Sequence, residues 1–307
     1  MPVTANTSID HIVLAFASDT QAPMWVETLW LRSHKNRAAT RLLFGDVVQR
    51  RPAVLFLLGD VVNLGYSNRQ WKPIDAYLAA LRERNISVHA ILGNHEVMGR
   101  PLLGEQKFQK RFPTHVRTGY FEVHDAVAVV LLNSNFNTLS KKEDQQQLTW
   151  YETTLQQLEE DSAVDFIITG CHHSPFTNSR VVRPSVEVEK KFVPLFLQSK
   201  KSQLFLSGHC HAFEHYLVGG KDFMVIGGGG GLRQPLRQGI GSLTDLAGAY
   251  KPLFHYLTVQ RRADQLQVAS IQLKKDFSGF DVGLKTDIKK QAATLIPEGH
   301  IIHSGTA

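Results

Sequence analysis

The sequence predicts an α/β protein in which short strands alternate with helices. Short apolar runs, rich in β-branched and aromatic side chains, recur along the chain, and each opens into a polar cluster. Longer segments between them repeat apolar residues at helical spacing. The composition, 43% hydrophobic and 20% charged over 307 residues, supplies a core large enough to fold without disulfides. These observations exclude a disordered chain, a collagen-like repeat and a small disulfide scaffold.

The apolar runs predict buried strands, because runs of this length and composition pack into a sheet. They lie at residues 12–16, 53–58, 86–92, 126–132, 165–169, 204–206 and 223–226. Helices are expected from about Asn68, from about Glu143 and over residues 192–196, where apolar side chains share one face. The pair Gly45-Asp46 is followed and preceded by apolar residues at helical spacing, so Asp46 is expected inside a helix.

The last third of the chain predicts a hairpin. Residues 253–259 and 266–273 are its strands, and residues 261–264 are its turn. Beyond Lys274 the sequence becomes polar and weakly patterned. We therefore expect one domain over residues 1–273 and a C-terminal tail over residues 274–307 that wraps around the domain or is flexible.

The charge and the cysteine content limit the environment of the protein. A net charge of +6 suits an anionic ligand, but a charge of this size is also ordinary for a protein surface. The basic residues are not interleaved with aromatic ones, so nucleic acid is the less favoured partner. Two cysteines, Cys171 and Cys210, indicate buried thiols in a reducing compartment. With no signal-peptide pattern and no membrane-spanning run, the sequence predicts a cytoplasmic protein.

Polar clusters follow the predicted strands at their carboxyl ends, where open α/β sheets bind ligands. Their members are aspartate, asparagine and histidine, namely Asp19, Asp60, Asn94, His173, His209 and His211. Carboxylate, amide and imidazole groups bind divalent metals of intermediate hardness, such as Mn, Fe, Zn or Ni. Six such groups exceed one tetrahedral site, and a shared aspartate holds two ions about 3.5–4 Å apart in dinuclear centres.

The residue types in these clusters and the order of the clusters resemble those of the calcineurin-like metallophosphoesterases over about residues 9–259. The match consists of Asp19, Gly59-Asp60, Gly93-Asn94-His95-Glu96, His173 ahead of Pro175, and Gly208-His209-Cys210-His211. The resemblance implies a four-layer α/β/β/α sandwich of the metallo-dependent phosphatase type, with the site at the C-terminal ends of the strands. Residues 1–273 are then the catalytic domain.

The resemblance also implies a role for each matched residue. Asp19 and His211 would bind the first of two divalent ions, Asp60 would bridge the two, and Asn94, His173 and His209 would bind the second. Gln21 would leave one position of the first ion to water or fill it with its amide oxygen. His95 would act as the general acid, with Glu96 as its orienting partner. A hydroxide held by both ions would attack phosphorus in line.

Two positions depart from the family pattern. Gln21 stands where many members have histidine, and because an amide is the poorer ligand, we expect weaker binding of the first metal than of the second. Asn63 stands where the purple acid phosphatases have a metal-binding tyrosine. We therefore expect a colourless enzyme, although the stretches around His173 and His209 otherwise resemble that branch.

Three further features have open interpretations. The spacing to Pro175 selects His173 as the ligand, and it leaves His172 as a neighbour of the ligands, a substrate-facing group or a structural residue. The glycines at 227–231 predict a tight structural turn in preference to a phosphate cradle. Arg233 follows them and is a candidate for contact with a substrate phosphate.

These observations together predict a dinuclear-metal hydrolase of phosphate esters, acting on a phosphorylated small molecule or nucleotide. The alternative is a phosphodiesterase or nuclease acting on cyclic nucleotides or nucleic acid, which the basic charge mildly favours. An alternative of another class is a catalytically inactive binding module, whose signature would be the loss of ligand residues. The sequence does not distinguish monoesters from diesters, because both chemistries use the same ligands.

Overall fold

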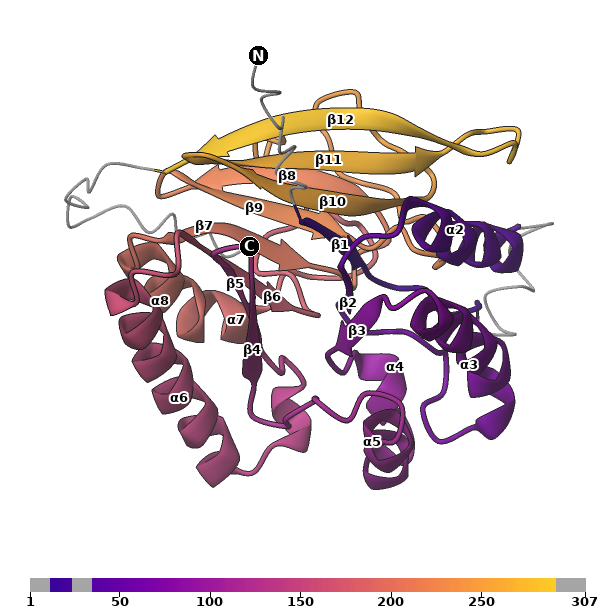
Figure 1. Ribbon diagram of the computed structural model, residues 1–307, viewed down its shortest axis with the longest axis horizontal. Coiled ribbons are helices and arrows are strands. Elements are labelled where there is room, and N and C mark those ends of the chain that lie inside the picture. The colour runs from indigo at the N-terminus through magenta and orange to yellow at the C-terminus, as the bar shows by residue number, and fades with distance from the viewer. Residues whose placement is uncertain (1–11, 24–34, 291–307) are drawn as a thin grey trace, which may run out of the picture.

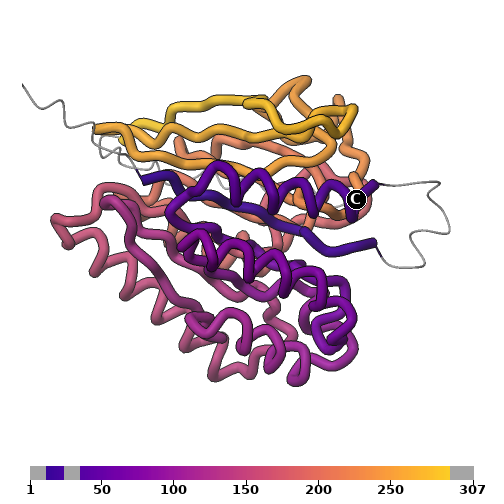
Figure 2. Tube along the Cα trace, turned by 45° about the vertical axis from the view of Figure 1, so that its right-hand side comes forward, coloured from indigo at the N-terminus to yellow at the C-terminus, as the bar shows by residue number. Residues whose placement is uncertain are grey.

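In a computed structural model, which describes residues 12–23 and 35–290, the chain forms two six-stranded sheets that face each other (Figure 1). The first sheet has the order β12-β11-β10-β1-β2-β3. Its strands are β1 (Val13–Ala17), β2 (Val54–Leu57), β3 (Ser87–Ala90), β10 (His255–Arg262), β11 (Gln265–Leu273) and β12 (Phe280–Lys289). β1, β2 and β3 run parallel, and β10 joins β1 in the antiparallel direction. β1 and β10, which lie far apart in the sequence, are therefore neighbours in the sheet (Figure 2).

The second sheet has the order β4-β5-β6-β7-β9-β8. Its strands are β4 (Tyr120–His124), β5 (Val127–Leu131), β6 (Phe166–Cys171), β7 (Ser202–Ser207), β8 (Phe213–Val218) and β9 (Lys221–Ile226). The pairs β5–β6, β6–β7 and β7–β9 are parallel, whereas β4 and β8 pair in the antiparallel direction. Parallel strands of this kind are buried on both faces, which explains why they read as continuous apolar runs in the sequence.

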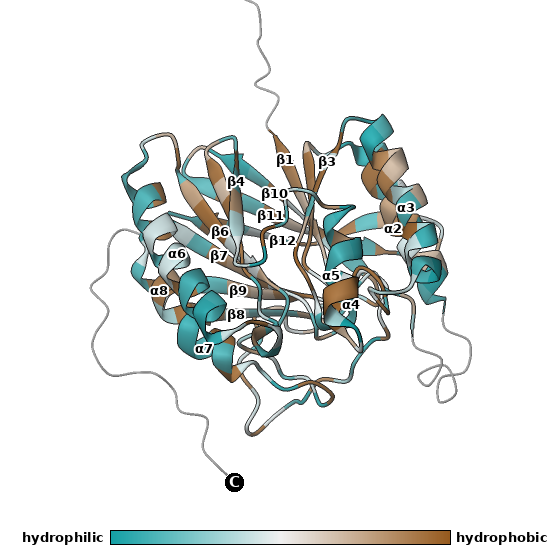
Figure 3. Cartoon of the chain, turned by 90° about the horizontal axis from the view of Figure 1, so that it is seen from below, coloured by the Kyte–Doolittle hydropathy of each residue, from teal (hydrophilic) through white to brown (hydrophobic). Residues whose placement is uncertain are grey.

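Helices flank both sheets (Figure 3). They are α2 (Asn36–Arg50), α3 (Asn68–Glu83), α4 (Asn94–Val97), α5 (Pro101–Gln109), α6 (Lys141–Glu160), α7 (Val186–Lys191) and α8 (Val193–Gln198). α6 begins at a capping box in which Ser140 and Glu143 accept hydrogen bonds from each other's backbone N–H groups. Asp46 lies within α2, which confirms the interpretation of the Gly45-Asp46 pair as helical. Among the described helices, none is long and apolar enough to cross a membrane.

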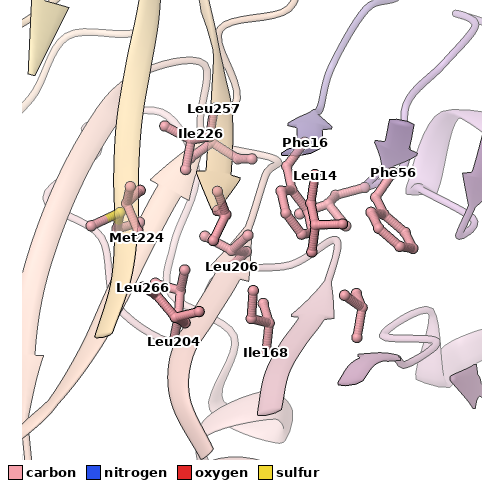
Figure 4. Close-up of a cluster of buried hydrophobic side chains, with 14 of the residues drawn as sticks. Leu14, Phe16, Phe56, Ile168, Leu204, Leu206, Met224, Ile226, Leu257 and Leu266 are labelled. Carbon is pink, nitrogen blue, oxygen red and sulfur yellow. The ribbon is translucent and has the colours of Figure 1, made fainter. Parts of the chain in front are cut away.

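Three apolar layers hold the four-layer sandwich together. The central layer lies between the sheets and includes Phe16, Phe56, Ile168 and Leu206 (Figure 4). A second layer joins the first sheet to α2 and α3, and a third joins the second sheet to α6, α7 and α8. Each sheet is thus covered on one face by helices and on the other by its partner sheet. The α/β/β/α arrangement expected from the family resemblance is confirmed.

The polar segment after Lys274 requires a correction. The sequence predicts a tail that wraps around the domain or is flexible, but Phe280–Lys289 forms β12, which pairs with β11 at the edge of the first sheet. The strand reads as polar because it is an edge strand: Ile288 is buried, whereas most of its other side chains are partly or fully exposed. Residues 291–307 of the expected tail lie outside the described residues.

Candidate metal centre

Three of the expected ligands occupy left-handed backbone conformations directly after strands. Asp19 (φ 59°), Asp60 (φ 51°) and His209 (φ 65°) follow the last residues of β1, β2 and β7 within three positions. Aspartate and histidine enter this region more often than most residues, and such backbone strain concentrates at functional sites. The turns bring the carboxyl ends of both sheets together, since Asp19 Oδ2 accepts a hydrogen bond from His209 N at 2.9 Å.

Asp60 lies at the centre of the cluster. Its carboxylate is 1% exposed, its Oδ2 lies 3.3 Å from His172 Nε2, and its Oδ1 accepts a hydrogen bond from His95 N at 2.9 Å. The ligand atoms of Asp19, Asp60 and His172 all lie within 4.8 Å of one another. Asn94 Oδ1 lies 3.0 Å from the same atom of His172. Asp60 therefore faces two groups of candidate ligands, the position that a bridging carboxylate requires.

Asp19 carries the clearest sign that a cation fits this site. Its Oδ1 is buried and has no hydrogen-bond partner, although His211 Nε2 lies 3.3 Å away. A buried carboxylate oxygen without a hydrogen-bond partner lowers the stability of the fold. A divalent ion would supply the missing partner, and the carboxylate, amide and imidazole groups around it are suitable ligands for such an ion. His211 Nδ1 donates to Leu232 O at 2.8 Å, which directs Nε2 towards Asp19.

The carboxylates of this cluster remain ionised. Burial alone would raise the pKa of Asp60, but the charge and hydrogen bond of His172 outweigh it and lower that pKa below its usual value. Burial likewise opposes ionisation of Asp19, whose pKa is nevertheless lowered, chiefly by His211 and His172. Burial disfavours the charged form of His172, yet Asp60 and Asp19 raise its pKa to about 9, so a metal bound at its Nε2 would take the place of this proton. The two aspartates are therefore in the form that binds cations.

The two adjacent histidines after β6 lie in different surroundings. His172 is fully buried, with Nδ1 2.9 Å from Leu58 O and Nε2 facing Asn94 and Asp60. His173 lies beside His209, with ring centroids 4.6 Å apart, and its Nδ1 is 2.8 Å from Ser134 Oγ. The spacing to Pro175 selected His173, and the ligand atoms of His172, His173 and His209 all lie within 4.8 Å of one another. Of the two adjacent histidines, His172 is the one that also faces the central carboxylate.

A physical reason explains this difference. The carbonyl of His172 still accepts a hydrogen bond from Gly208 N at 2.9 Å, so this residue continues the pairing of β6 with the β7 end. The side chain of His172 is therefore held at the carboxyl end of β6, next to Leu58 O. His173 lies one residue further along the loop. Ser134, which positions His173, was not predicted to be functional. It lies in a polar cluster after β5, and that strand-end position is the signal that identifies it.

Gln21 has the orientation that a ligand requires. In the amide orientation that satisfies its own nitrogen and oxygen, the nitrogen donates hydrogen bonds to Asp60 O at 2.8 Å and to Asp19 O at 3.1 Å. Its oxygen then lies on the side of the Asp60 carboxylate and of His211 Nε2. The amide oxygen thus faces the cluster where many relatives carry an imidazole.

His95 is the second residue of α4 and lies beside the central carboxylate. Its Nδ1 lies 3.0 Å from Asn63 O and donates to that carbonyl, while its Nε2 lies 3.8 Å from Asp60 Oδ2. The ring is 14% exposed, in contrast to the buried carboxylate. Asn63 itself is buried, and its Oδ1 has no hydrogen-bond partner. His95 is thus fixed at one nitrogen and leaves the other free on the side of the site.

Glu96 has a different role from the one expected. Its buried carboxylate accepts hydrogen bonds from the backbone N–H groups of Asp60 (2.8 Å), Val62 (3.0 Å) and Gly93 (2.8 Å). Burial and the nearby charge of Asp60 raise the pKa of Glu96 to about 8. The side chain therefore fixes the two loops that carry Asp60 and His95 and does not orient the His95 ring.

Replacement of Glu96 by alanine is expected to lower the free energy of unfolding by about 3–5 kcal/mol, because three buried N–H groups lose their acceptor. Urea denaturation of the metal-free chain measures this loss. Glu83→Ala, an exposed residue at the end of α3, is the matched control and should change stability by less than about 0.5 kcal/mol. Equal stability of the two variants would show that Glu96 does not join the loops.

The glycines at 227–231 wrap around the ligand loops. Gly229 N donates to Ser18 O at 2.9 Å, and Gly231 N donates to Asp19 O at 2.8 Å. A side chain at Gly231 would collide with the ring of His211. Because two of the amides are already bonded to the β1 loop, the segment supports the structural-turn interpretation.

A cleft of about 740 Å³ opens beside the cluster, with Asn94 and His173 in its wall. Its other lining residues include Met98, Leu102 and Phe136. Arg233 lies elsewhere: it is exposed and lines a separate hollow with Lys251, although its neighbour Leu232 holds His211. The structure therefore brings the predicted metal ligands together and leaves Arg233 outside this cleft.

A four-layer sandwich that gathers carboxylate, amide and imidazole groups at its strand ends defines a metal-dependent phosphoesterase. The model of the calcineurin-like phosphoesterase family matches residues 12–213, and the chain belongs to this family. No curated protein sequence matches the chain significantly.

Solved structures share the fold at low sequence identity. The purple acid phosphatase PPD1 of yellow lupin (Lupinus luteus) is 13% identical with a TM-score of 0.72, over 91% of this chain and 53% of the lupin chain. This chain thus spans about half of that protein. GAP50 of Plasmodium, an anchor in the inner membrane complex, is 15% identical with a TM-score of 0.68, over 92% of this chain and 90% of the GAP50 chain. A dimetal phosphatase of Danio rerio is 13% identical with a TM-score of 0.59, over 91% of this chain and 99% of the phosphatase chain.

Proposed function

We propose that the chain hydrolyses phosphate esters with two divalent ions bound at the candidate metal centre. The first ion would be held by Asp19, Gln21, Asp60 and His211, and the second by Asp60, Asn94, His172 and His209. The observation that carries this proposal is the position of Asp60, which faces Asn94 and His172 and lies in one group of ligand atoms with Asp19. The dimetal phosphatase from Danio rerio, whose fold is similar, also supports the proposal.

The bound ions would supply Lewis acidity towards the phosphoryl oxygens and would lower the pKa of the attacking water. The chain's own contribution is to orient the groups around them. His95 Nδ1 donates a hydrogen bond to Asn63 O, which fixes the ring. The proton on the other nitrogen, Nε2, is then the one that the ring would give to the leaving oxygen as a general acid. Glu96 keeps the loops of Asp60 and His95 in register through three backbone hydrogen bonds.

The cleft beside Asn94 favours an apolar leaving group. Met98, Leu102 and Phe136 offer apolar surface, and Asn135, Asn137 and Ser185 add neutral polar groups. The lining residues include one cation, Arg117, which is paired with Glu105 and with Glu143. A row of free cations, as a nucleic-acid backbone requires, is thus absent from this cleft. We infer a monoester of an aryl alcohol or of a nucleoside as the substrate class.

Removal of metal is the experiment that tests the proposed function. A chelator should abolish hydrolysis of an aryl phosphate, and Mn or Zn should restore it, because the carboxylates cannot activate water alone. A panel of aryl phosphate, bis-aryl phosphate, a cyclic nucleotide and single-stranded DNA then measures the preference. Faster cleavage of the diesters or of DNA would replace the monoesterase by the phosphodiesterase or nuclease. Failure to cleave any substrate with Mn, Fe, Zn or Ni would overturn the proposed function.

A further inference from the structure

A second group of metal-binding side chains lies away from the candidate metal centre. His89, Glu122 and His124 each offer a ligand atom, and these atoms lie within 4.8 Å of one another. His89 belongs to β3 and the other two to β4, the end strands of the two facing sheets (Figure 1). Glu122 and His124 share one face of β4, and only the fold brings His89 to them.

The geometry of this group suits one metal ion. His89 Nδ1 lies 3.4 Å from Glu122 Oε1, close to the ~3.3 Å that separates two ligands of a tetrahedral zinc ion bound at about 2.0–2.1 Å. Two imidazoles and one carboxylate are a recurrent ligand set for zinc and for other divalent transition metals. Glu122 is 32% exposed, which leaves access for a water molecule as the fourth ligand.

The imidazole of His124 supplies an independent observation. Its Nε2 is buried and has no hydrogen-bond partner. A buried ring nitrogen in that state is costly unless a further partner binds it. Burial lowers the pKa of His89 and of His124, which favours the neutral ring that coordinates a metal.

The contact between the two edge strands does not require these three side chains. Tyr120 already joins β4 to β3, because its hydroxyl accepts a hydrogen bond from Ala90 N at 3.0 Å and donates to Ala90 O at 2.9 Å. The rings of His89 and His124 lie against Phe56, with centroids 5.5 and 6.0 Å from it, at the rim of the central apolar layer. His89 Nδ1 also lies 3.2 Å from Thr114 Oγ1, a contact that a metal bound at this nitrogen would replace.

The group is separate from the candidate metal centre. β4 runs antiparallel to β5, so that His124 pairs with Val127 at the start of β5, while Leu131 at its end leads to the cleft. The four residue steps from Val127 to Leu131 span about 13 Å. Loss of a ligand here should therefore leave hydrolysis unchanged.

We propose that His89, Glu122 and His124 form a distinct binding site for one divalent transition metal of the zinc type, which ties the edge strand of one sheet to that of the other. The proposal does not depend on the function of the candidate metal centre. A metal bound to the folded state alone should raise the melting temperature.

Zinc binding to the full chain tests the proposal. The chain is stripped with chelator, loaded with Zn²⁺ and dialysed, and the zinc retained per chain is measured by mass spectrometry. His124→Ala should retain one zinc fewer than the natural sequence, with unchanged aryl phosphate hydrolysis and a smaller rise in melting temperature on addition of zinc. Val123→Ala, an exposed neighbour on the same strand, is the matched control and should lose none.

Glu122→Gln keeps the shape of a partly exposed side chain, so it should fold even where the histidine variant does not, and it should weaken zinc retention in the same way. Equal zinc content in the natural chain and in both variants would overturn the proposal. So would an equal loss of zinc in Val123→Ala, because that result would indicate a general effect on the strand.

Discussion

Asp60→Asn is expected to lower kcat/KM for an aryl phosphate roughly 10³-fold, equivalent to about 4 kcal/mol of transition-state stabilisation. The candidate metal centre contains two buried carboxylates, Asp19 and Asp60, to balance two divalent ions. Loss of the central one leaves a single negative side chain for both ions, so the variant should also retain at least one metal fewer than the natural sequence. Steady-state kinetics and metal analysis measure the two effects.

The control for Asp60→Asn is His95→Gln, which should separate metal binding from proton transfer. Loss of a general acid costs about 10²-fold or more in turnover, while the metal content should remain that of the natural chain. If His95→Gln loses metal as well, the histidine is a ligand and its role as proton donor is wrong. If Asp60→Asn keeps its full metal content and stays within tenfold of the natural activity, the bridging role of Asp60 is wrong.

Continuous burial determined how much of the fold could be predicted. β2, β5 and β6 are buried along their whole length and appear in the sequence as unbroken apolar runs. β4 was not predicted because it is an edge strand in which buried and exposed side chains alternate, and β12 was missed for the same reason. Sequence patterns of this kind therefore identify central strands more reliably than edge strands.

The part of the candidate metal centre that could be predicted consists of ligand-type residues placed directly after strands. Asp19, Asp60, Asn94 and His209 follow strands, and the fold gathers them as expected. Glu96 was assigned to the wrong neighbour, because its partners are backbone N–H groups that no sequence motif displays.

The histidines show the limit of reasoning from motifs. His89 and His124 belong to no motif, since they approach one another only when the edges of two sheets meet. The choice between His172 and His173 depends on which residue continues the pairing of β6, a backbone property that adjacent identical residues cannot reveal. The three-dimensional contacts place His172 against Asp60 and His173 against His209, a difference that the sequence does not reveal.

His172→Ala and His173→Ala should differ sharply, and the comparison tests the assignment of the second metal. His172 faces Asn94 and Asp60 from a fully buried position, so its loss should remove one metal ion and lower kcat roughly 10²–10³-fold. His173 lies in the wall of the cleft, bonded to Ser134, so its loss should leave the metal content unchanged and act mainly on KM. Metal analysis and steady-state kinetics of both variants measure the difference.

Folding must be separated from metal binding in this comparison, because His172 Nδ1 also bonds Leu58 O. His172→Asn is the variant that retains a polar side chain at the buried position, and circular dichroism reports whether each variant is folded. A folded His172 variant that keeps its metal, beside a His173 variant that loses it, would restore the assignment drawn from the spacing to Pro175. The opposite pattern would show that the second ion is bound directly at the carboxyl end of β6, where His172 faces Asp60.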